Sequence, residues 1–140
     1  MLRRWSDSHL GLVPAQEKKE APVFLQFVMG VLGGIDAAPE QLMHMEATAN
    51  RLIGSENHLI SVLAAANHQI RLATMGAILV GNVRVGLEHN LFIGKPKLAT
   101  SNAQQVKLIR TILDNLGLEI ATPEQARQRL NLKSADKVNF

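Results

Sequence analysis

Residues 58–88, HLISVLAAANHQIRLATMGAILVGNVRVGLE, contain two strand-like runs separated by a helix-like run. HLISVLAAA (58–66) is short and apolar, as expected of a buried strand. HQIRLATMGAILV (68–80) predicts a helix, and NVRVGLE (82–88) predicts the next strand. The apolar stripe of the predicted helix comprises Ile70, Ala73, Ala77 and Val80. Buried apolar strands joined by a helix predict parallel strands in one sheet.

The same order of elements occurs upstream of this unit. PVFLQFV (22–28) predicts a buried strand, GVLGGI (30–35) a Gly-rich turn, and PEQLMHMEATANRLI (39–53) a helix. Pro39 suits the first turn of that helix, and Glu40 suits the positive end of its dipole. A second strand–helix unit therefore precedes the first.

Two further helices are predicted downstream. SNAQQVKLIRTILDNLG (101–117) has a capping box formed by Ser101 and Gln104, and Gly117 suits its C-terminal cap. Its apolar stripe comprises Val106, Ile109, Leu113 and Leu116. A short last helix, ending near Leu130, is predicted by the start signal of Thr122, Pro123 and Gln125.

The pattern βα-βα-βα-α predicts an α/β fold with a parallel sheet covered by helices. Three parallel strands leave both sheet edges open, and such a sheet is expected to be marginal and prone to aggregate alone. We therefore expect residues 21–132 to form part of a larger domain. Residues 1–20 are expected to be a polar leader, and residues 133–140 a loose tail.

The composition of the 140 residues excludes several classes of protein. The net charge of +3 is small and spread along the chain, so no nucleic-acid partner is expected. The absence of Cys excludes disulfides and a thiolate zinc site, and it agrees with a cytoplasmic location. No run reaches about 18 apolar residues, so neither a membrane span nor a membrane partner is expected. The basic N-terminus lacks the apolar stretch of a signal peptide.

The segment RVGLEHN (84–90) places polar groups at the end of a predicted strand. Strand alternation puts Arg84, Gly86 and Glu88 on one face, with space over the glycine for another group. Glu88 and His89 lie at the C-terminal end of the strand, where parallel α/β folds bind ligands. A carboxylate there can bind a metal, and Arg84 can hold an anionic substrate or a developing oxyanion.

Two alternatives remain open from the residues alone. Arg84 and Glu88 can form an ion pair that only neutralises itself at a strand end. The turn GVLGGI (30–35) could serve a small anion- or nucleotide-binding domain, but it lacks the G-x-G-x-x-G spacing and a P-loop Lys. The other histidines do not complete a metal site, since they are scattered and no H-x-H occurs: His9, His44, His58 and His68.

RVGLEHN (84–90) resembles the R-V-G-L-E-D-N signature of the β-keto acid cleavage enzymes. The resemblance is colinear over about residues 21–132 and covers several spaced motifs. These are PVFLQFVMGVLGGI (22–35), APEQLMHM (38–45), TSNAQQV (100–106) and ATPEQARQRL (121–130). Because several motifs agree, the resemblance is specific.

The resemblance implies a (β/α)₈ barrel of which this chain supplies the last three βα units and a short terminal helix. It implies a reaction of a β-keto acid with acetyl-CoA that yields acetoacetate and a new acyl-CoA. It also implies zinc, bound by an H-x-H pair from the other part of the barrel and by Glu88. Arg84 would hold the acyl group, and the family Asp at position 89 would position Arg84 and tune proton transfer.

Several residues depart from the family pattern. His89 stands in place of Asp and lacks its permanent negative charge. AAANHQ (64–69) replaces a G-x-G-R-x-Q-like segment, so alanine stands where glycine would allow a positive φ. Pro96 replaces a residue that is usually Gly, and the H-x-H pair is absent. These departures predict a truncated or split piece, inactive alone.

The implied partner is the missing barrel half or a full-length relative, in a homo- or hetero-oligomer. The alternative is a non-enzymatic interaction subunit that pairs with a full-length relative through its open sheet edge and uncovered apolar face.

Overall fold

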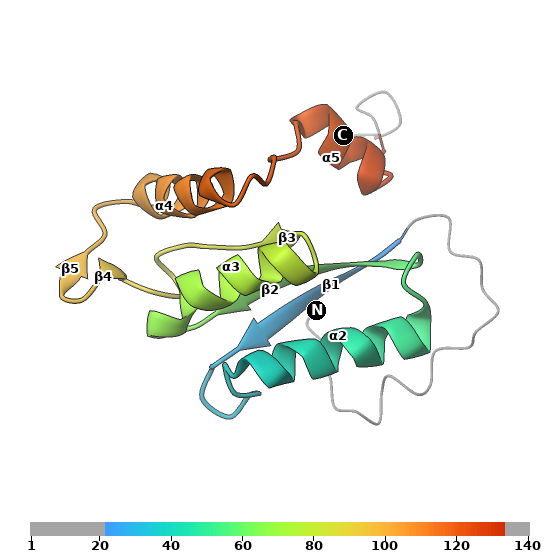
Figure 1. Ribbon diagram of the computed structural model, residues 1–140, viewed down its shortest axis with the longest axis horizontal. Coiled ribbons are helices and arrows are strands. Elements are labelled where there is room, and N and C mark those ends of the chain that lie inside the picture. The colour runs from blue at the N-terminus through green and yellow to red at the C-terminus, as the bar shows by residue number, and fades with distance from the viewer. Residues whose placement is uncertain (1–21, 134–140) are drawn as a thin grey trace.

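The computed structural model describes residues 22–133, in which three parallel strands form the central sheet (Figure 1). The strands are β1 (Val23–Met29), β2 (His58–Ala64) and β3 (Asn82–Val83), and they lie in that order. β1 pairs with β2 along its whole length, whereas β3 pairs only at its two residues. The parallel α/β arrangement predicted from the apolar runs is confirmed. The predicted leader (1–20) lies outside the described residues, as does all of the predicted tail except Lys133.

Within residues 22–133, four α-helices accompany the sheet. The helix α2 (Pro39–Ile53) has the predicted bounds, and α3 (Gln69–Leu79) follows the short 3₁₀ turn η1 (Ala66–His68). α4 (Asn102–Asn115) and α5 (Pro123–Arg129) end the described chain. None of the helices within residues 22–133 has the length and apolar character needed to cross a membrane.

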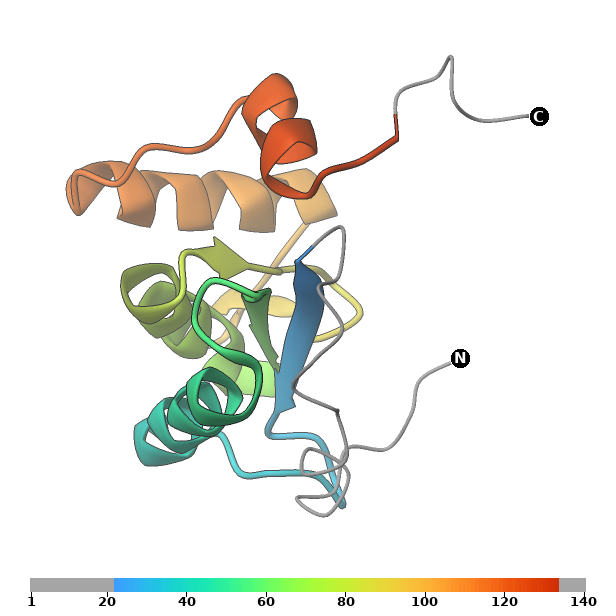
Figure 2. The same ribbon diagram turned by 90° about the vertical axis from the view of Figure 1, so that its right-hand side faces the viewer.

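Helices α2 and α3 cover one face of the sheet (Figure 2). The inward side chains of β1 and β2 meet them in a single apolar core, since alternate strand residues point to the same face. Its buried members are Leu25, Phe27, Met29, Ala37, Leu42, Ala49, Ile60, Val62, Ala64 and Leu72. Gly76 brings α3 close to β2, because a Cβ there would lie 2.8 Å from Val62 Cβ.

The opposite face of β1 is exposed, and this corrects the prediction of a fully buried strand. Phe24 is 52% exposed and Val28 is 43% exposed, whereas Leu25, Phe27 and Met29 are buried. A parallel-sheet strand is apolar on both faces because both faces are normally covered. Within residues 22–133, helices cover only one of them. The apolar run of β1 predicts that both faces are buried, but within residues 22–133 only one face is covered. We call the other face, with Phe24 and Val28, the open sheet face.

A second, smaller core joins α3, β3 and α4. Ala73, Ile109 and Leu113 are buried there, and Val83 and Val85 pack against them. The predicted stripe of α4 is only half correct, because Val106 and Leu116 are 44% and 47% exposed. The stripe predicted for α3 is shifted, since the buried residues of that helix are Gln69, Leu72, Ala73 and Gly76.

The predicted helix caps are mostly confirmed. The side chain of Ser101 accepts a hydrogen bond from Gln104 N at 3.2 Å, but the Gln104 side chain bonds to Thr100 N, so the box is half formed. Thr122 and Gln125 form a complete capping box at α5. Gly117 has a φ of +70° and lies just beyond the C-terminal cap of α4, as predicted.

An antiparallel hairpin joins the sheet to α4. It consists of β4 (Phe92–Gly94) and β5 (Lys97–Leu98), and no element was predicted for this segment. Strands this short contain too few residues to establish an alternation of apolar and polar side chains. The hairpin lies beyond the C-terminal end of β3 (Figure 1).

Candidate functional site

The predicted third strand is shorter than expected, and its remainder forms a turn. Arg84 N still donates to Val62 O at 2.9 Å, which extends the ladder one residue beyond Val83. The chain then reverses, because Gly86 O accepts hydrogen bonds from His89 N at 3.1 Å and from Asn90 N at 3.2 Å. The prediction of a strand over 82–88 is therefore wrong for its second half. We call residues 86–90 the signature turn.

Two buried glutamine side chains hold the signature turn from beneath. Gln69 Nε2 donates to Gln105 Oε1 at 2.6 Å, and Gln69 Oε1 accepts from Gly86 N at 3.1 Å. Gln105 Nε2 donates to the carbonyl of Asn90. Both glutamines are 0% exposed, so each hydrogen bond satisfies a group that water does not reach. The start of α3 and the first turn of α4 are thus joined to both ends of the turn.

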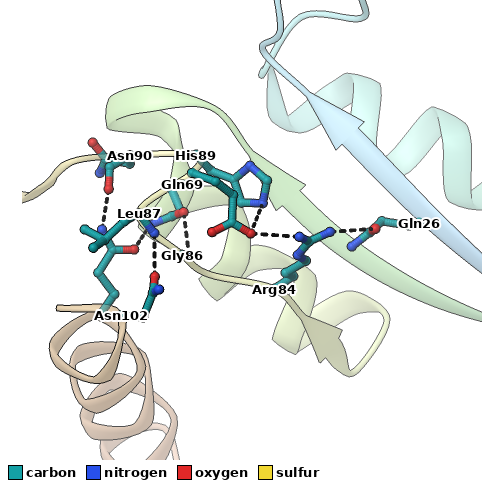
Figure 3. A network of polar contacts seen from close by, with 10 residues as sticks. Gln26, Gln69, Arg84, Gly86, Leu87, His89, Asn90 and Asn102 are labelled. Atoms are coloured by element: carbon teal, nitrogen blue, oxygen red, sulfur yellow. Dashed lines mark hydrogen bonds and ion pairs between the residues drawn. The ribbon is translucent and has the colours of Figure 1, made fainter.

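Further hydrogen bonds fix the backbone between these ends. Leu87 N donates to Asn102 Oδ1 at 2.7 Å (Figure 3), and Ala66 N donates to His89 O at 2.7 Å. Ala66 itself has a φ of 52°, in the left-handed region that favours glycine. This agrees with the prediction that alanine replaces a glycine required here. The turn is therefore bonded to α3, α4 and η1 at once.

The side chain of Arg84 connects the turn to the sheet. Its Nη2 lies 2.7 Å from Glu88 Oε1, and its Nη1 donates to Gln26 Oε1 at 3.3 Å (Figure 3). Both members of the ion pair are about half exposed, at 48% and 52%, so the pair contributes little to stability. The ion pair considered in the sequence analysis does form, and it holds the Glu88 carboxylate in a defined place.

Gly86 has a different role from the one predicted. The space above it is filled by the Glu88 carboxylate, because a Cβ on Gly86 would lie 2.9 Å from Glu88 Cδ. The prediction that Gly86 leaves room for an external group is therefore wrong. The glycine instead lets the carboxylate fold back over the turn.

Glu88 is ionised at neutral pH. Its own backbone amide, and then the Arg84 guanidinium, hold the pKa of the Glu88 carboxyl below its usual value, while burial acts weakly in the opposite direction. His89 Nε2 lies 3.4 Å from the same Glu88 Oε1. Among the described residues this nitrogen is buried and has no hydrogen-bond partner.

A cavity of about 790 Å³ opens beside these groups. It lies between η1, the signature turn and the β4–β5 hairpin, at the C-terminal ends of β2 and β3. Its lining residues are Ala66, Asn67, Leu87, Glu88, His89, Asn90, Leu91, Phe92, Lys95 and Pro96. Its lining combines apolar side chains with a few polar and charged ones, among them Glu88 and Lys95, as is typical of sites for small molecules.

The three residues predicted for the site are brought together around one oxygen atom, Glu88 Oε1. The donor set suits zinc in kind, because an ionised carboxylate and an imidazole nitrogen without a hydrogen-bond partner are both zinc ligands. No group of three or more His, Cys, Asp or Glu gathers within residues 22–133. Within residues 22–133, Glu88 and His89 thus lack the third protein donor of a zinc site.

The other histidines are elsewhere. His44 is exposed on α2, and His58 is buried with its Nδ1 2.8 Å from Gly54 O. His68 lies in η1, and His9 lies outside the described residues. None of the described three joins Glu88 in a group of three or more metal-binding side chains.

The sequence model of the beta-keto acid cleavage enzyme family matches residues 9–132 of this chain. This chain belongs to the β-keto acid cleavage enzyme family. The match ends where the motif resemblance ends and begins earlier than residue 21.

Curated relatives agree with this assignment. The chain is 50% identical over 119 residues to the 3,5-dioxohexanoate:acetyl-CoA acetone transferase of Paraburkholderia graminis. It is 35% identical over 114 residues to the 3-keto-5-aminohexanoate cleavage enzyme of Fusobacterium nucleatum. It is also 35% identical over 113 residues to the 3-dehydrocarnitine:acetyl-CoA trimethylamine transferase of Rhizobium meliloti.

These alignments cover 85%, 81% and 81% of this chain, but only 38%, 39% and 36% of the respective relatives. The chain thus spans about two fifths of the length of the relatives that it matches.

The residues that hold the signature turn were missed by sequence reasoning. Gln69 lies in the segment AAANHQ (64–69) and Asn102 in TSNAQQV (100–106), but neither segment predicts a hydrogen bond to the turn. Gln105 carried no signal, since one polar residue on a helix predicts a solvent-facing side chain. The one available clue was the position of Gln105, an amide side chain on the face of α4 that also carries the buried Ile109 and Leu113.

Proposed function

We propose that this chain contributes part of the active site of a β-keto acid cleavage enzyme that converts a β-keto acid and acetyl-CoA to acetoacetate and a new acyl-CoA. The observation that best supports this is that Arg84 and His89 both approach the Glu88 carboxylate. Glu88 and His89 also line a cavity beside the C-terminal ends of parallel strands. Ligands of parallel α/β folds bind at that end. The names of two relatives, which pair a keto substrate with acetyl-CoA, support the same reaction class.

Each residue has a distinct role in this proposal. Glu88, already anionic, serves as a zinc ligand, and Arg84 binds the carboxylate or the developing oxyanion of the substrate. Zinc, when bound, would act as a Lewis acid on the substrate's keto oxygen. Gln26 offers Arg84 a second partner when substrate draws the guanidinium away from Glu88.

We further propose that the sheet belongs to a (β/α)₈ barrel completed by another polypeptide segment, which carries the H-x-H ligands. The open sheet face supports this, because Phe24 and Val28 are apolar and about half exposed. In a closed barrel that face would line the interior, where it would be packed by other strands. The length ratio of about two fifths also fits three of eight βα units.

The test is reconstitution with the complementary part of a relative. The chain is co-expressed with the first five βα units of the Paraburkholderia graminis relative, and acetoacetate formation from acetyl-CoA and 3,5-dioxohexanoate is measured together with zinc content. We expect a stable complex with about one zinc and measurable turnover. Glu88→Gln should abolish turnover and lower zinc content. A stable complex that remains inactive with a panel of β-keto acids would contradict the proposal.

The second candidate, a non-enzymatic interaction subunit, is favoured by one observation, the exposed apolar side chains of the open sheet face. In that case the chain would bind a full-length relative without contributing to its turnover. Co-purification with the relative and unchanged turnover on Glu88→Gln would support this candidate. Loss of turnover in that variant would support the enzymatic one.

A further inference from the structure

His89 Nε2 is a buried nitrogen with no hydrogen-bond partner among residues 22–133. Buried polar side-chain atoms nearly always have a partner, so each exception requires an explanation. Leaving such a group without one costs about 1–3 kcal/mol. The His89 backbone is held in place by the hydrogen bond from Ala66 N to its carbonyl and by the bond from its own amide to Gly86 O. The ring is therefore held where its nitrogen has no partner.

Glu88 Oε1 lies near His89 Nε2, but the distance between the two atoms is too long for a strong hydrogen bond. The two atoms are 3.4 Å apart and lack hydrogen-bond geometry. A charge-assisted N–H···O bond would shorten to about 2.7–2.9 Å. Two atoms that bind one tetrahedral zinc ion, at about 2.0–2.2 Å each, lie about 3.4 Å apart. The observed separation thus matches that of two ligands of one zinc ion.

We propose that His89 Nε2 and Glu88 Oε1 together bind a divalent transition-metal ion, with zinc as the expected ion. This deepens the proposed function, on which it rests for the location of the metal, by adding a nitrogen ligand from this chain. His89 then acts as a ligand in place of the proton-transfer role implied by the family Asp. An Nε2 lone pair that is bound to a metal cannot accept a proton.

The rest of the site is compatible with this pair. A carboxylate oxygen has two lone pairs, so Oε1 can keep the Arg84 contact on one side and face His89 on the other. The signature turn that carries both ligands is held by the buried side chains of Gln69 and Gln105. Such preorganisation lowers the entropy lost when a metal binds. Glu88 and His89 both line the cavity, so in the lone chain the remaining coordination positions are open to water. In the completed barrel the H-x-H pair would fill two of them, and substrate would bind as a fifth ligand.

Two protein ligands beside an Arg make a weak metal site. The test therefore compares the zinc affinities of variants with that of the wild-type chain. The full 140-residue chain is titrated with zinc alone by calorimetry. Cu²⁺ is then used as an EPR probe, because nitrogen coupling in its spectrum reports a bound imidazole. We expect one zinc site. His89→Gln and Glu88→Gln should each lower the zinc affinity at least about tenfold, because replacing even the residues that only hydrogen-bond to metal ligands lowers metal affinity about 10–100-fold. His89→Gln should also remove the nitrogen coupling.

The matched control is His44→Gln, which removes an exposed imidazole from α2 and should leave affinity and coupling unchanged. Gly86→Ala is a second variant that removes no ligand. It pushes the Glu88 carboxylate away from its place over Gly86 and should weaken zinc binding while circular dichroism stays unchanged. Zinc affinity and nitrogen coupling that survive His89→Gln would overturn the proposal.

Failure here is distinguishable from failure of the proposed function, because neither substrate nor acetyl-CoA is present in this experiment. In the reconstituted complex, His89→Asp restores the family residue and removes the imidazole. We expect zinc affinity to fall at least about threefold in that complex, because the H-x-H pair and Glu88 would retain the metal with one ligand fewer. Unchanged affinity, with turnover intact, would overturn the ligand assignment and leave the cleavage function standing.

Discussion

The signature turn and the open sheet face lie in the same small structure but differ in how far their groups are satisfied. The polar groups of the turn have hydrogen-bond partners, whereas the apolar side chains of the face are not fully covered. The turn has its backbone groups bonded to Gln69, Gln105, Asn102 and Ala66, all within residues 22–133. On the open sheet face, Phe24 and Val28 are apolar and remain about half exposed. The contrast teaches that the geometry of the candidate site is built locally, whereas residues 22–133 bury only one face of the strands.

The largest expected effect concerns the buried amides under the turn. Gln105→Leu removes the donor to the Asn90 carbonyl and the acceptor of Gln69 Nε2, which leaves two buried groups unsatisfied. We expect a loss of about 3 kcal/mol in the free energy of unfolding, measured by urea denaturation. The exposed Gln128→Leu on α5 is the control and should change stability by less than about 0.5 kcal/mol. Equal effects would show that the turn is not held as described.

A pair of isosteric changes tests the two faces of the sheet directly. Val62 is 0% exposed under α3, and Val28 is 43% exposed on the neighbouring strand. Val62→Thr buries a hydroxyl and should destabilise the chain by about 2 kcal/mol. Val28→Thr should cost less than about 0.5 kcal/mol in the lone chain. If Val28→Thr becomes as costly as Val62→Thr once the complementary segment of a relative is present, the open sheet face is buried in the complex.

Ala66 tests whether the turn carries strain. Its φ of 52° disfavours alanine by about 1–2 kcal/mol, while glycine loses about 0.5–1 kcal/mol more in conformational entropy on folding. Ala66→Gly should therefore stabilise the chain by about 0.5 kcal/mol, seen as a raised denaturation midpoint. Ala65→Gly, at the adjacent extended residue, is the control and should destabilise it. Destabilisation by both changes would mean that Ala66 is not strained.

The smallest effect concerns pH. Because the folded-state pKa of Glu88 lies below the usual value of 4.5, its contribution to stability is present above 4.5 and is lost as pH falls through the lowered pKa. The difference in unfolding free energy between the wild-type chain and Glu88→Gln should shrink over that window. The exposed, screened ion pair makes the effect small. A difference that grows on acidification would contradict the assigned direction of the shift.

Much of the fold follows from local sequence signals. The bounds of α2 were predicted correctly because Pro39 and the helical periodicity act within one segment. β3 was predicted too long, because alternation in Val83–Leu87 continues after the chain has lost its partner strand. A strand ends where its partner strand ends, and the alternation within one segment does not show where that is. The hairpin of β4 and β5 escaped prediction because its strands are too short for a pattern.

The sequence by itself determined the alternation of strands and helices, the family, and the grouping of Arg84, Glu88 and His89. These depend on residues close in the chain, whose spacing is imposed by strand and turn geometry. Only the tertiary structure decided that the carboxylate fills the space over Gly86, that Gln105 reaches the turn from α4, and that one imidazole nitrogen is buried beside Glu88 without a hydrogen bond. The physical reason is that these contacts depend on how α3, α4 and the hairpin pack together, and packing is not encoded in the spacing of any single segment.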